Sequence, residues 1–210
     1  MRRLSRCFAN KFLPDSQESV NFEDVSGMAA GYIFYFFLQY IMAKDKHAAV
    51  AKTNVARLLD KAKVAYELIP YEVDENDLAA DHVARQLGED INRVFKTLVL
   101  SCEFGGGKGT GHLVCVVPGN TEVDLKKAAK AAGAKNAELI AMKELLPLTG
   151  YIRGGCSPVG MKKPFPTFFH FTANDFDHIY VSAGMRGLQV KIAPADLIGY
   201  VGATVCDLVK

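Results

Sequence analysis

The spacing of apolar and polar residues predicts a helix, a strand and a second helix at the start of the patterned region. Residues 48–63 place apolar side chains at helical spacing. Residues 65–73 alternate as a strand does, and Pro70 within them marks a sheet edge or a bend. Residues 78–87 predict a helix that ends at Gly88, because glycine readily takes the backbone conformation of a C-terminal cap.

A long apolar strand and its return predict a β-hairpin in the middle of the chain. Residues 93–103 and 112–118 are the two strands, and Gly105–Gly111 form the turn between them. This turn does not fit a phosphate-binding loop, which needs Ser or Thr directly after its Gly-Lys pair and opens a helix. Here Gly109 follows Lys108 and a strand comes next, so we interpret the segment as a hairpin tip.

Two short helices are predicted after the hairpin. Residues 123–132 are rich in Ala and Lys and stop at Gly133, with Thr121 as a candidate N-terminal cap. Residues 138–146 predict the other helix. The Gly- and Pro-rich segment that follows reads as a connection between short strands.

The C-terminal part predicts a strand pair and a final helix. Residues 178–182 and 187–192 are strands joined by a tight turn, and Pro194 opens a helix over residues 194–200. Hairpins mixed with helices, without regular strand–helix alternation, are typical of α+β proteins. We therefore predict an α+β fold with a mixed, largely antiparallel curved sheet flanked by helices.

The N-terminal segment differs from the rest of the chain. Residues 1–41 are rich in aromatic side chains and end in an apolar run that is shorter than the about 20 residues of a membrane-spanning helix. Acidic residues precede this run and no small-residue cleavage site follows it, unlike a signal peptide. We expect residues 1–41 to be an extension outside the fold, with Met42 as the natural start and residues 42–210 as one domain. A membrane-associating segment is the alternative.

Composition excludes several classes of protein. With 50% hydrophobic and 23% charged residues, the chain is neither wholly disordered, collagen-like nor dense in disulfides. A net charge of +2 argues against a strongly basic nucleic-acid binder but leaves a local basic face open. Five scattered cysteines without a CxxC pair indicate a reducing, cytoplasmic location. His112 and Cys115 would face opposite sides of a strand, so we expect no metal site.

Two features carry candidate chemistry. Lys96 shares an apolar strand face with Val94 and Leu98, and such a lysine either extends to solvent at a sheet edge or lines a pocket. The loop Gly154–Gly160 contains three glycines, a hydroxyl and a proline, which allow backbone N–H groups to approach an anion or a carbonyl oxygen. A plain tight connection is the alternative for this loop.

Four segments, in order, resemble the YbaK-type Cys-tRNA(Pro) deacylases. Relatives of that type are the editing insertion domain of bacterial prolyl-tRNA synthetase and free-standing alanyl-tRNA-editing proteins. The resemblance runs from about Thr53 to Val209 and does not include residues 1–41. The segments are VFKTLVL (Val94–Leu100), VDLKKAAKAAGAK (Val123–Lys135), TGYIRGGCSPVGMKK (Thr149–Lys163) and IYVSAGMRGLQV (Ile179–Val190).

The resemblance implies the α+β fold of that family and a trans-acting deacylase of mischarged Cys-tRNA(Pro), with Cys-tRNA(Cys) as a second candidate substrate. It implies that Lys96 is the essential lysine, associated with binding the tRNA 3′ end. The implied partners are aminoacylated tRNA and prolyl-tRNA synthetase, with no cofactor and no membrane association of the core domain. The remaining implied substrate-binding residues are Tyr71, Thr97, Gly154, Gly155, Ser157, Pro158, Gly160, Ser182 and Arg186.

The implied mechanism uses the substrate itself. No Ser-His-Asp or Cys-His signature is evident in the sequence. This absence fits the mechanism proposed for the YbaK type, in which the thiol of the bound cysteine attacks the ester carbonyl and releases a cyclic thiolactone. Cys156 has no sequence cue for a base beside it, and we interpret it as a thiol that only fills space.

One position departs from the resemblance. YbaK-type proteins commonly carry Asp directly after the Arg-Gly-Leu of the last strand pair, and this chain has Gln189. This departure leaves open a catalytically weakened module that binds the tRNA 3′ end. An Ala-tRNA(Pro)-type deacylase is a second alternative, because the assignment to the YbaK type rests on overall similarity.

Overall fold

The structure is a computed structural model that describes residues 52–75, 77–105 and 109–210. The predictions for residues 1–41 and for a start at Met42 lie outside the described residues. All the elements described below belong to one compact unit, Ala51–Lys210.

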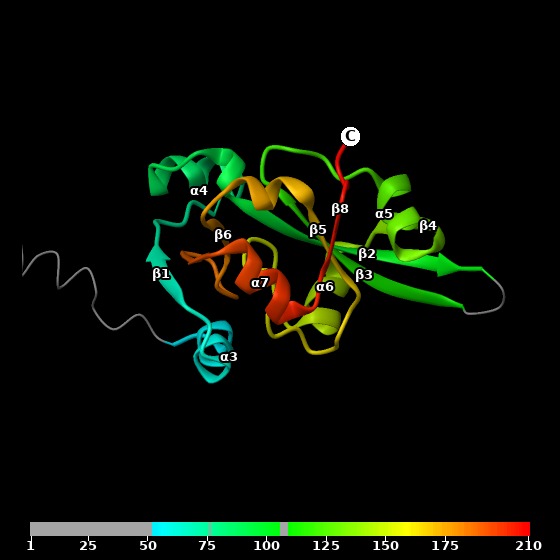
Figure 1. The fold of residues 1–210 in the computed structure, drawn as a ribbon, viewed down its shortest axis with the longest axis horizontal. Helices are drawn as coiled ribbons and strands as arrows, with labels where there is room; N and C mark the ends of the chain where they lie inside the picture. The colour runs from blue at the N-terminus through cyan, green and yellow to red at the C-terminus, as the bar shows by residue number, and fades with distance from the viewer. Residues whose placement is uncertain (1–51, 76, 106–108) are drawn as a thin grey trace, which may run out of the picture. The chain divides into compact units, whose positions relative to one another are not determined.

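A five-stranded sheet has the order β4-β2-β3-β5-β8 (Figure 1). The predicted hairpin is confirmed, because β2 and β3 pair antiparallel along their length. β4 pairs antiparallel with the other edge of β2, whereas β5 pairs parallel with β3 and β8 parallel with β5. The strands are β4 (Ala134–Leu139), β2 (Phe95–Phe104), β3 (Thr110–Pro118), β5 (Thr167–His170) and β8 (Thr204–Cys206).

A three-stranded antiparallel sheet contains β1 (Tyr66–Pro70), β7 (Leu188–Ile192) and β6 (Ile179–Ser182), in that order. The predicted strands at residues 178–182 and 187–192 are thus confirmed. The strand predicted over residues 65–73 is shorter, because the edge strand β1 ends at Pro70. A parallel bridge between Val94 and Tyr180 joins this sheet to the beginning of β2.

Three helices, α4, α5 and α7, lie close to their predicted positions, and Gly88 and Gly133 cap α4 and α5 in the left-handed conformation. The helix predicted over residues 48–63 is confirmed only from Asn54 onward, because Thr53 caps the N-terminus of α3, and residues 48–51 lie outside the described residues. The N-terminal cap of α5 is Asp124, which accepts hydrogen bonds from two backbone N–H groups, whereas Thr121 donates to the Pro118 carbonyl. The helices are α3 (Asn54–Ala62), α4 (Ala80–Leu87), α5 (Leu125–Ala132), α6 (Met142–Thr149) and α7 (Pro194–Val201), with short 3₁₀ turns at Ile91–Arg93 and Phe171–Asp175.

The helix predicted over residues 138–146 is wrong in its first half. Residues 134–139 form β4, and the helix α6 begins only at Met142. The outer edge of β2 needs a partner for its backbone groups, and pairing of Leu139 with Leu100 provides it. The prediction also missed β5 and β8, whose pairing is with distant parts of the chain.

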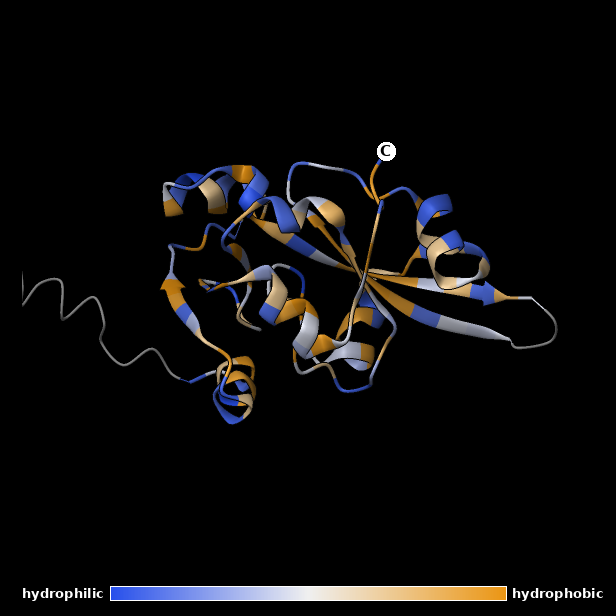
Figure 2. Cartoon of the chain, in the orientation of Figure 1, coloured by the Kyte–Doolittle hydropathy of each residue, from blue (hydrophilic) through white to orange (hydrophobic). Residues whose placement is uncertain are grey.

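The main core lies between the five-stranded sheet and α5. Leu100, Leu113 and Val117 from the hairpin are fully buried against Ala128 of α5 and Leu208 near the C-terminus. The helices carry both hydrophilic and hydrophobic residues along their length, as expected for helices that bury one side (Figure 2). This core fixes the hairpin, and the beginning of β2 extends from it toward the three-stranded sheet.

Candidate functional site

A cavity of about 530 Å³ lies where the beginning of β2 meets the three-stranded sheet. Its size is typical of small-molecule sites, which range over about 300–1,000 Å³. The lining comes from segments far apart in sequence, namely residues 71–74 and 77–83, the beginning of β2, residues 139–145, residues 153–156, and single residues of β6 and β7. Of the predicted site residues, Tyr71, Lys96, Thr97, Gly154 and Ser182 line the cavity.

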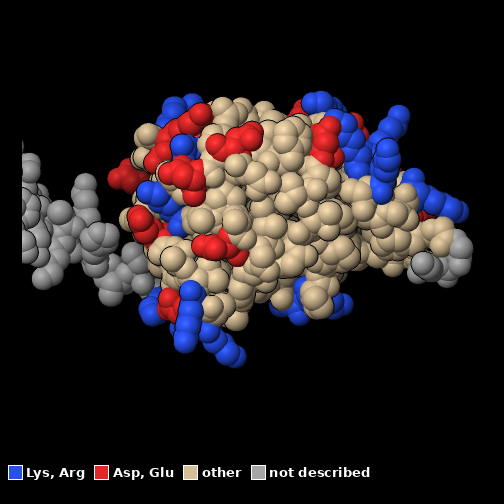
Figure 3. All heavy atoms as spheres, in the orientation of Figure 1, with Lys and Arg blue, Asp and Glu red and all other residues tan. Residues whose placement is uncertain are grey.

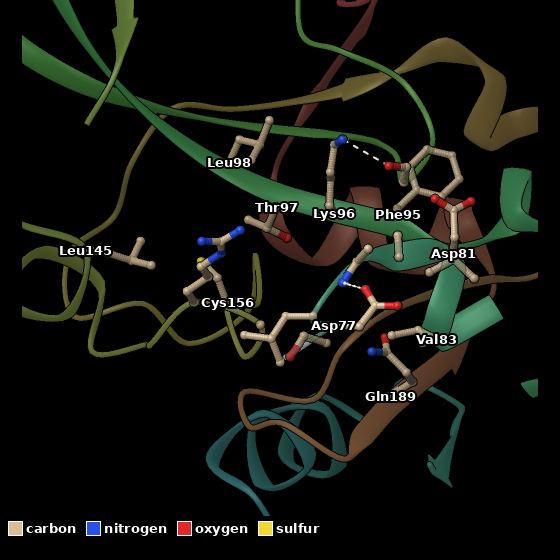
Figure 4. A pocket seen from close by; sticks show the side chains of 18 of the residues that line it. Asp77, Asp81, Val83, Phe95, Lys96, Thr97, Leu98, Leu145, Cys156 and Gln189 are labelled. Atoms are coloured by element: carbon tan, nitrogen blue, oxygen red, sulfur yellow. Dashed lines mark hydrogen bonds between the residues drawn. The ribbon is translucent and has the colours of Figure 1, made fainter. Parts of the chain in front are cut away.

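Lys96 brings a half-buried amine to the cavity. Its Nζ donates a hydrogen bond of 2.9 Å to the Gly119 carbonyl, which holds the side chain across the beginning of the hairpin (Figure 4). Burial lowers the pKa of Lys96, while the negative charges of Glu122 and Asp81 oppose this change. A positioned ammonium group of this kind can bind an oxygen-rich ligand.

Two buried oxygen atoms in the cavity have no hydrogen-bond partner among the described residues. These atoms are Thr97 Oγ1 and Gln189 Oε1, and Gln189 is only 5% exposed. A buried polar atom without a partner costs about 1–3 kcal/mol. Such atoms therefore indicate a place where a ligand supplies the missing hydrogen bonds.

Ser182 and Tyr71 complete the wall formed by the three-stranded sheet. Ser182 is buried at the end of β6, where its Oγ accepts a hydrogen bond of 3.3 Å from the Gly184 backbone N–H. Tyr71 follows β1, and its backbone N–H donates to the Gly187 carbonyl at 3.0 Å. Hydrogen bonds with backbone groups thus fix both residues in the cavity wall.

The glycine-rich loop reaches the cavity at two residues, Gly154 and Cys156. Gly155, Ser157, Pro158 and Gly160 do not line it, and Ser157 and Pro158 are buried inside the loop.

Close packing accounts for two of the glycines. A Cβ on Gly155 would lie 3.1 Å from Met185 Cα, and one on Gly160 would lie 2.7 Å from Leu58 of α3. Gly160 also has a positive φ of 74°, which favours glycine.

Arg186 acts on this loop from outside the cavity. Its Nε donates a hydrogen bond of 2.9 Å to the Arg153 carbonyl, and its guanidinium group forms an ion pair with Glu75. These contacts tie the glycine-rich loop to the segment after β1. Arg186 therefore positions Gly154 and does not line the cavity itself.

The Cys156 thiol is not prepared to act as a nucleophile. Burial raises its pKa to about 12, so the thiol stays protonated near neutral pH. No described histidine lines the cavity, and His170 instead accepts a hydrogen bond from the Leu208 backbone N–H at the far end of the sheet. The described cavity residues thus include neither an activated nucleophile nor a histidine base.

Sequence reasoning missed two parts of the lining. One is acidic, with Asp77 and Asp81 at the beginning of α4. The other is apolar, and its last four members run from the end of β4 into α6; they are Leu98, Leu139, Ile140, Met142 and Leu145. Period-2 alternation could have placed Leu98 beside Lys96, but it gave no signal for the rest.

The described residues contain no cluster of three or more side chains suited to bind a metal ion. Within the same part of the chain, every helix is too short or too polar to cross a membrane.

Comparison with known proteins identifies the class. The aminoacyl-tRNA editing domain family matches residues 75–200, which include most of the cavity lining. The chain therefore belongs to this family. A similar protein is EbsC of Enterococcus faecalis (strain ATCC 700802 / V583), described as a Cys-tRNA(Pro)/Cys-tRNA(Cys) deacylase. The two are 46% identical over 157 residues, which cover 75% of this chain and 92% of EbsC.

Solved structures confirm the fold. A crystal structure described as a trans-editing enzyme for prolyl-tRNA synthetase has a TM-score of 0.62 at 23% identity, covering 75% of this chain and 98% of that one. The crystal structure of the hypothetical protein APE2540 has a TM-score of 0.66 at 21% identity, covering 74% and 99%. The predicted family resemblance and α+β fold are thus confirmed.

Proposed function

We propose that this protein is an aminoacyl-tRNA deacylase that hydrolyses Cys-tRNA(Pro), with Cys-tRNA(Cys) as a second substrate. The observation that carries the proposal is the cavity, which combines the Lys96 amine and two unpartnered acceptors with no activated protein nucleophile. The 46% identity to EbsC supports the same substrates.

The residues present support a reaction in which the bound cysteine supplies the nucleophile. Its sulfur attacks the ester carbonyl carbon, a C–S bond forms, and the C–O bond to the ribose breaks. The thiol proton ends on the released ribose hydroxyl, and the product is a cyclic thiolactone that water later opens to cysteine. The protein then contributes position and electrostatics, with Lys96 holding the oxygen-rich 3′ end.

The surface supports binding of RNA. Lys126 and Lys130 of α5 and Lys135 of β4 are exposed, and Figure 3 shows basic side chains gathered over α5 with acidic side chains beside them. Such a basic region attracts phosphates without reading their sequence. We expect tRNA selection to come in part from a complex with prolyl-tRNA synthetase, which co-purification of the two proteins would test.

Deacylation of Cys-, Ser- and Ala-tRNA(Pro) under identical conditions tests the function and the mechanism together. A pocket alone separates the nearly isosteric cysteine and serine by about a hundredfold or less. A thiol is also a better nucleophile, because an appreciable fraction ionises near neutral pH. We therefore expect a Cys-to-Ser rate ratio well above that limit, and thiolactone in the mass spectrum of the products.

Each contrary result has its own meaning. Comparable rates on the three substrates would indicate attack by water and the alanine-editing alternative. Binding of Cys-tRNA(Pro) without hydrolysis would indicate the weakened binding module, for which the neutral Gln189 is the specific observation.

A further inference from the structure

The cavity has two chemically different halves. One part of the lining carries hydrogen-bonding side chains, among them Asp81, Arg153 and Gln189, and the other, which we name the apolar shelf, carries none. Figure 4 shows Leu98 and Leu145 on one side, Asp81 and Gln189 on the other, and Thr97 between them. The apolar shelf consists of Leu98, Leu139, Ile140, Met142 and Leu145.

The outer part of the apolar shelf is exposed to an unusual degree for such side chains. Leu139 is 56% exposed and Met142 is 58% exposed, although both line the cavity. Large apolar side chains gathered at a cavity mouth mark a place where a ligand covers them. The inner part is different, because Leu145 is buried and Leu98 packs against the main core.

The backbone holds the apolar shelf in place. Leu139 pairs with Leu100 as the last residue of β4, and the Ile140 N–H donates to the Val99 carbonyl at 3.3 Å. Met142 then opens α6 directly after this pairing. The shelf is therefore fixed to the edge of β2, next to Lys96 on the same strand.

The two halves suit different parts of an aminoacylated nucleoside. The ester, the α-ammonium group and the ribose hydroxyls all need hydrogen-bond partners once they are buried. Only the half with Thr97 and Gln189 supplies free acceptors. The acyl group of a small amino acid fills little of a cavity of about 530 Å³, so the remaining space adjoins the apolar shelf.

We propose that the apolar shelf binds the base of the terminal adenosine of tRNA, with a face of the ring against Leu139 and Met142. A base has a broad apolar face and no other part of the substrate does, so it gains from contact with side chains that cannot hydrogen-bond. The inference rests on the proposed function, because that function is what brings an adenosine ester to the cavity. On this inference, Leu139 and Met142 make the protein prefer an aminoacyl ester of adenosine to an aminoacyl ester that has no base.

The test compares kcat/KM for 3′-O-cysteinyl adenosine with kcat/KM for cysteine ethyl ester, which lacks the base. In Met142→Ser and in Leu139→Ser, the preference for the adenosine ester should fall about tenfold, because each substitution removes apolar surface that the base would cover. Leu146→Ser is the matched control, because Leu146 also lies on α6, is 50% exposed and does not line the cavity. Its preference should stay that of the wild type.

Titration with adenosine keeps the inference testable without catalysis. In protein labelled at the methionine methyl groups, adenosine should shift the NMR signal of Met142 saturably, and ribose 5-phosphate should not. If neither ester is hydrolysed but the Met142 signal shifts with adenosine, the proposed deacylase function is wrong and the proposed binding of the base by the apolar shelf is supported. The proposed binding of the base by Leu139 and Met142 would be refuted if both variants kept the wild-type ester preference, or if adenosine caused no saturable shift. The proposal would also fail if the two variants changed only the preference between cysteinyl and alanyl esters of adenosine, because the shelf would then contact the amino acid and not the base.

Discussion

Replacing Lys96 with methionine should remove most of the deacylation while leaving the protein folded. Methionine keeps most of the apolar stem but removes the ammonium group that donates to Gly119. The same ammonium group is proposed to hold the 3′ end of the substrate, and a hydrogen bond from a charged group contributes about 1.5–3 kcal/mol. At 1.4 kcal/mol for each factor of ten, kcat/KM should therefore fall roughly 10- to 150-fold.

The Lys96→Met variant should unfold close to the wild-type temperature, because it loses the hydrogen bond to Gly119 and also the cost of burying a charge. Burial lowers the pKa of Lys96 from its ordinary value of 10.5, so the charged form is disfavoured in the folded state. At neutral pH the wild type carries this cost and the variant does not. As pH rises through the lowered pKa toward 10.5, Lys96 loses its proton in the folded state before it does so in the unfolded state. The cost of burying the charge then disappears, and the stability of the wild type increases.

The assay measures initial rates on Cys-tRNA(Pro) together with thermal unfolding, with Lys96→Arg as the partner variant. Arginine stays charged across the accessible pH range, so the wild-type to Lys96→Arg rate ratio should fall as pH rises through the lowered pKa of Lys96. Taking the ratio cancels the ionisation of the substrate thiol. Near wild-type turnover by Lys96→Met, with an unchanged melting temperature, would refute the reasoning.

Two further substitutions test the cavity and its supporting loop. Gln189→Leu removes a buried acceptor without a partner, so kcat/KM should fall about tenfold while the melting temperature stays or rises; a loss of both would show that Gln189 is only structural. Gly160→Ala should lower the unfolding free energy by about 1–3 kcal/mol more than Gly88→Ala, because Leu58 crowds only the former, and equal losses in denaturant titrations would contradict this.

Most of the fold follows from local patterns. The β2–β3 hairpin, the β6–β7 pair and α7 lie where alternation, turn residues and a first-turn proline predict them. β4 could not be predicted, because AKNAEL has low strand propensity and is a strand only through its pairing with β2. β5 and β8 are likewise short and pair with strands that are distant in sequence.

The site was predictable only where one strand carries it. Lys96 and Thr97 reach the cavity on a strand whose pattern is plain in the sequence, whereas the loop Gly154–Gly160 looks like a cradle and mostly is not one. Glycine is needed in this loop because other parts of the chain pack closely against it, and the sequence does not reveal these contacts. Gly155 packs against Met185, and Gly160 packs against α3. A glycine-rich motif records that the backbone must pass closely or turn sharply, but it does not say whether a ligand or another part of the chain makes the approach. Unpartnered oxygens point to a ligand site where they gather in a cavity, as those of Thr97 and Gln189 do, whereas Thr172 Oγ1 also lacks a partner but does not line the cavity.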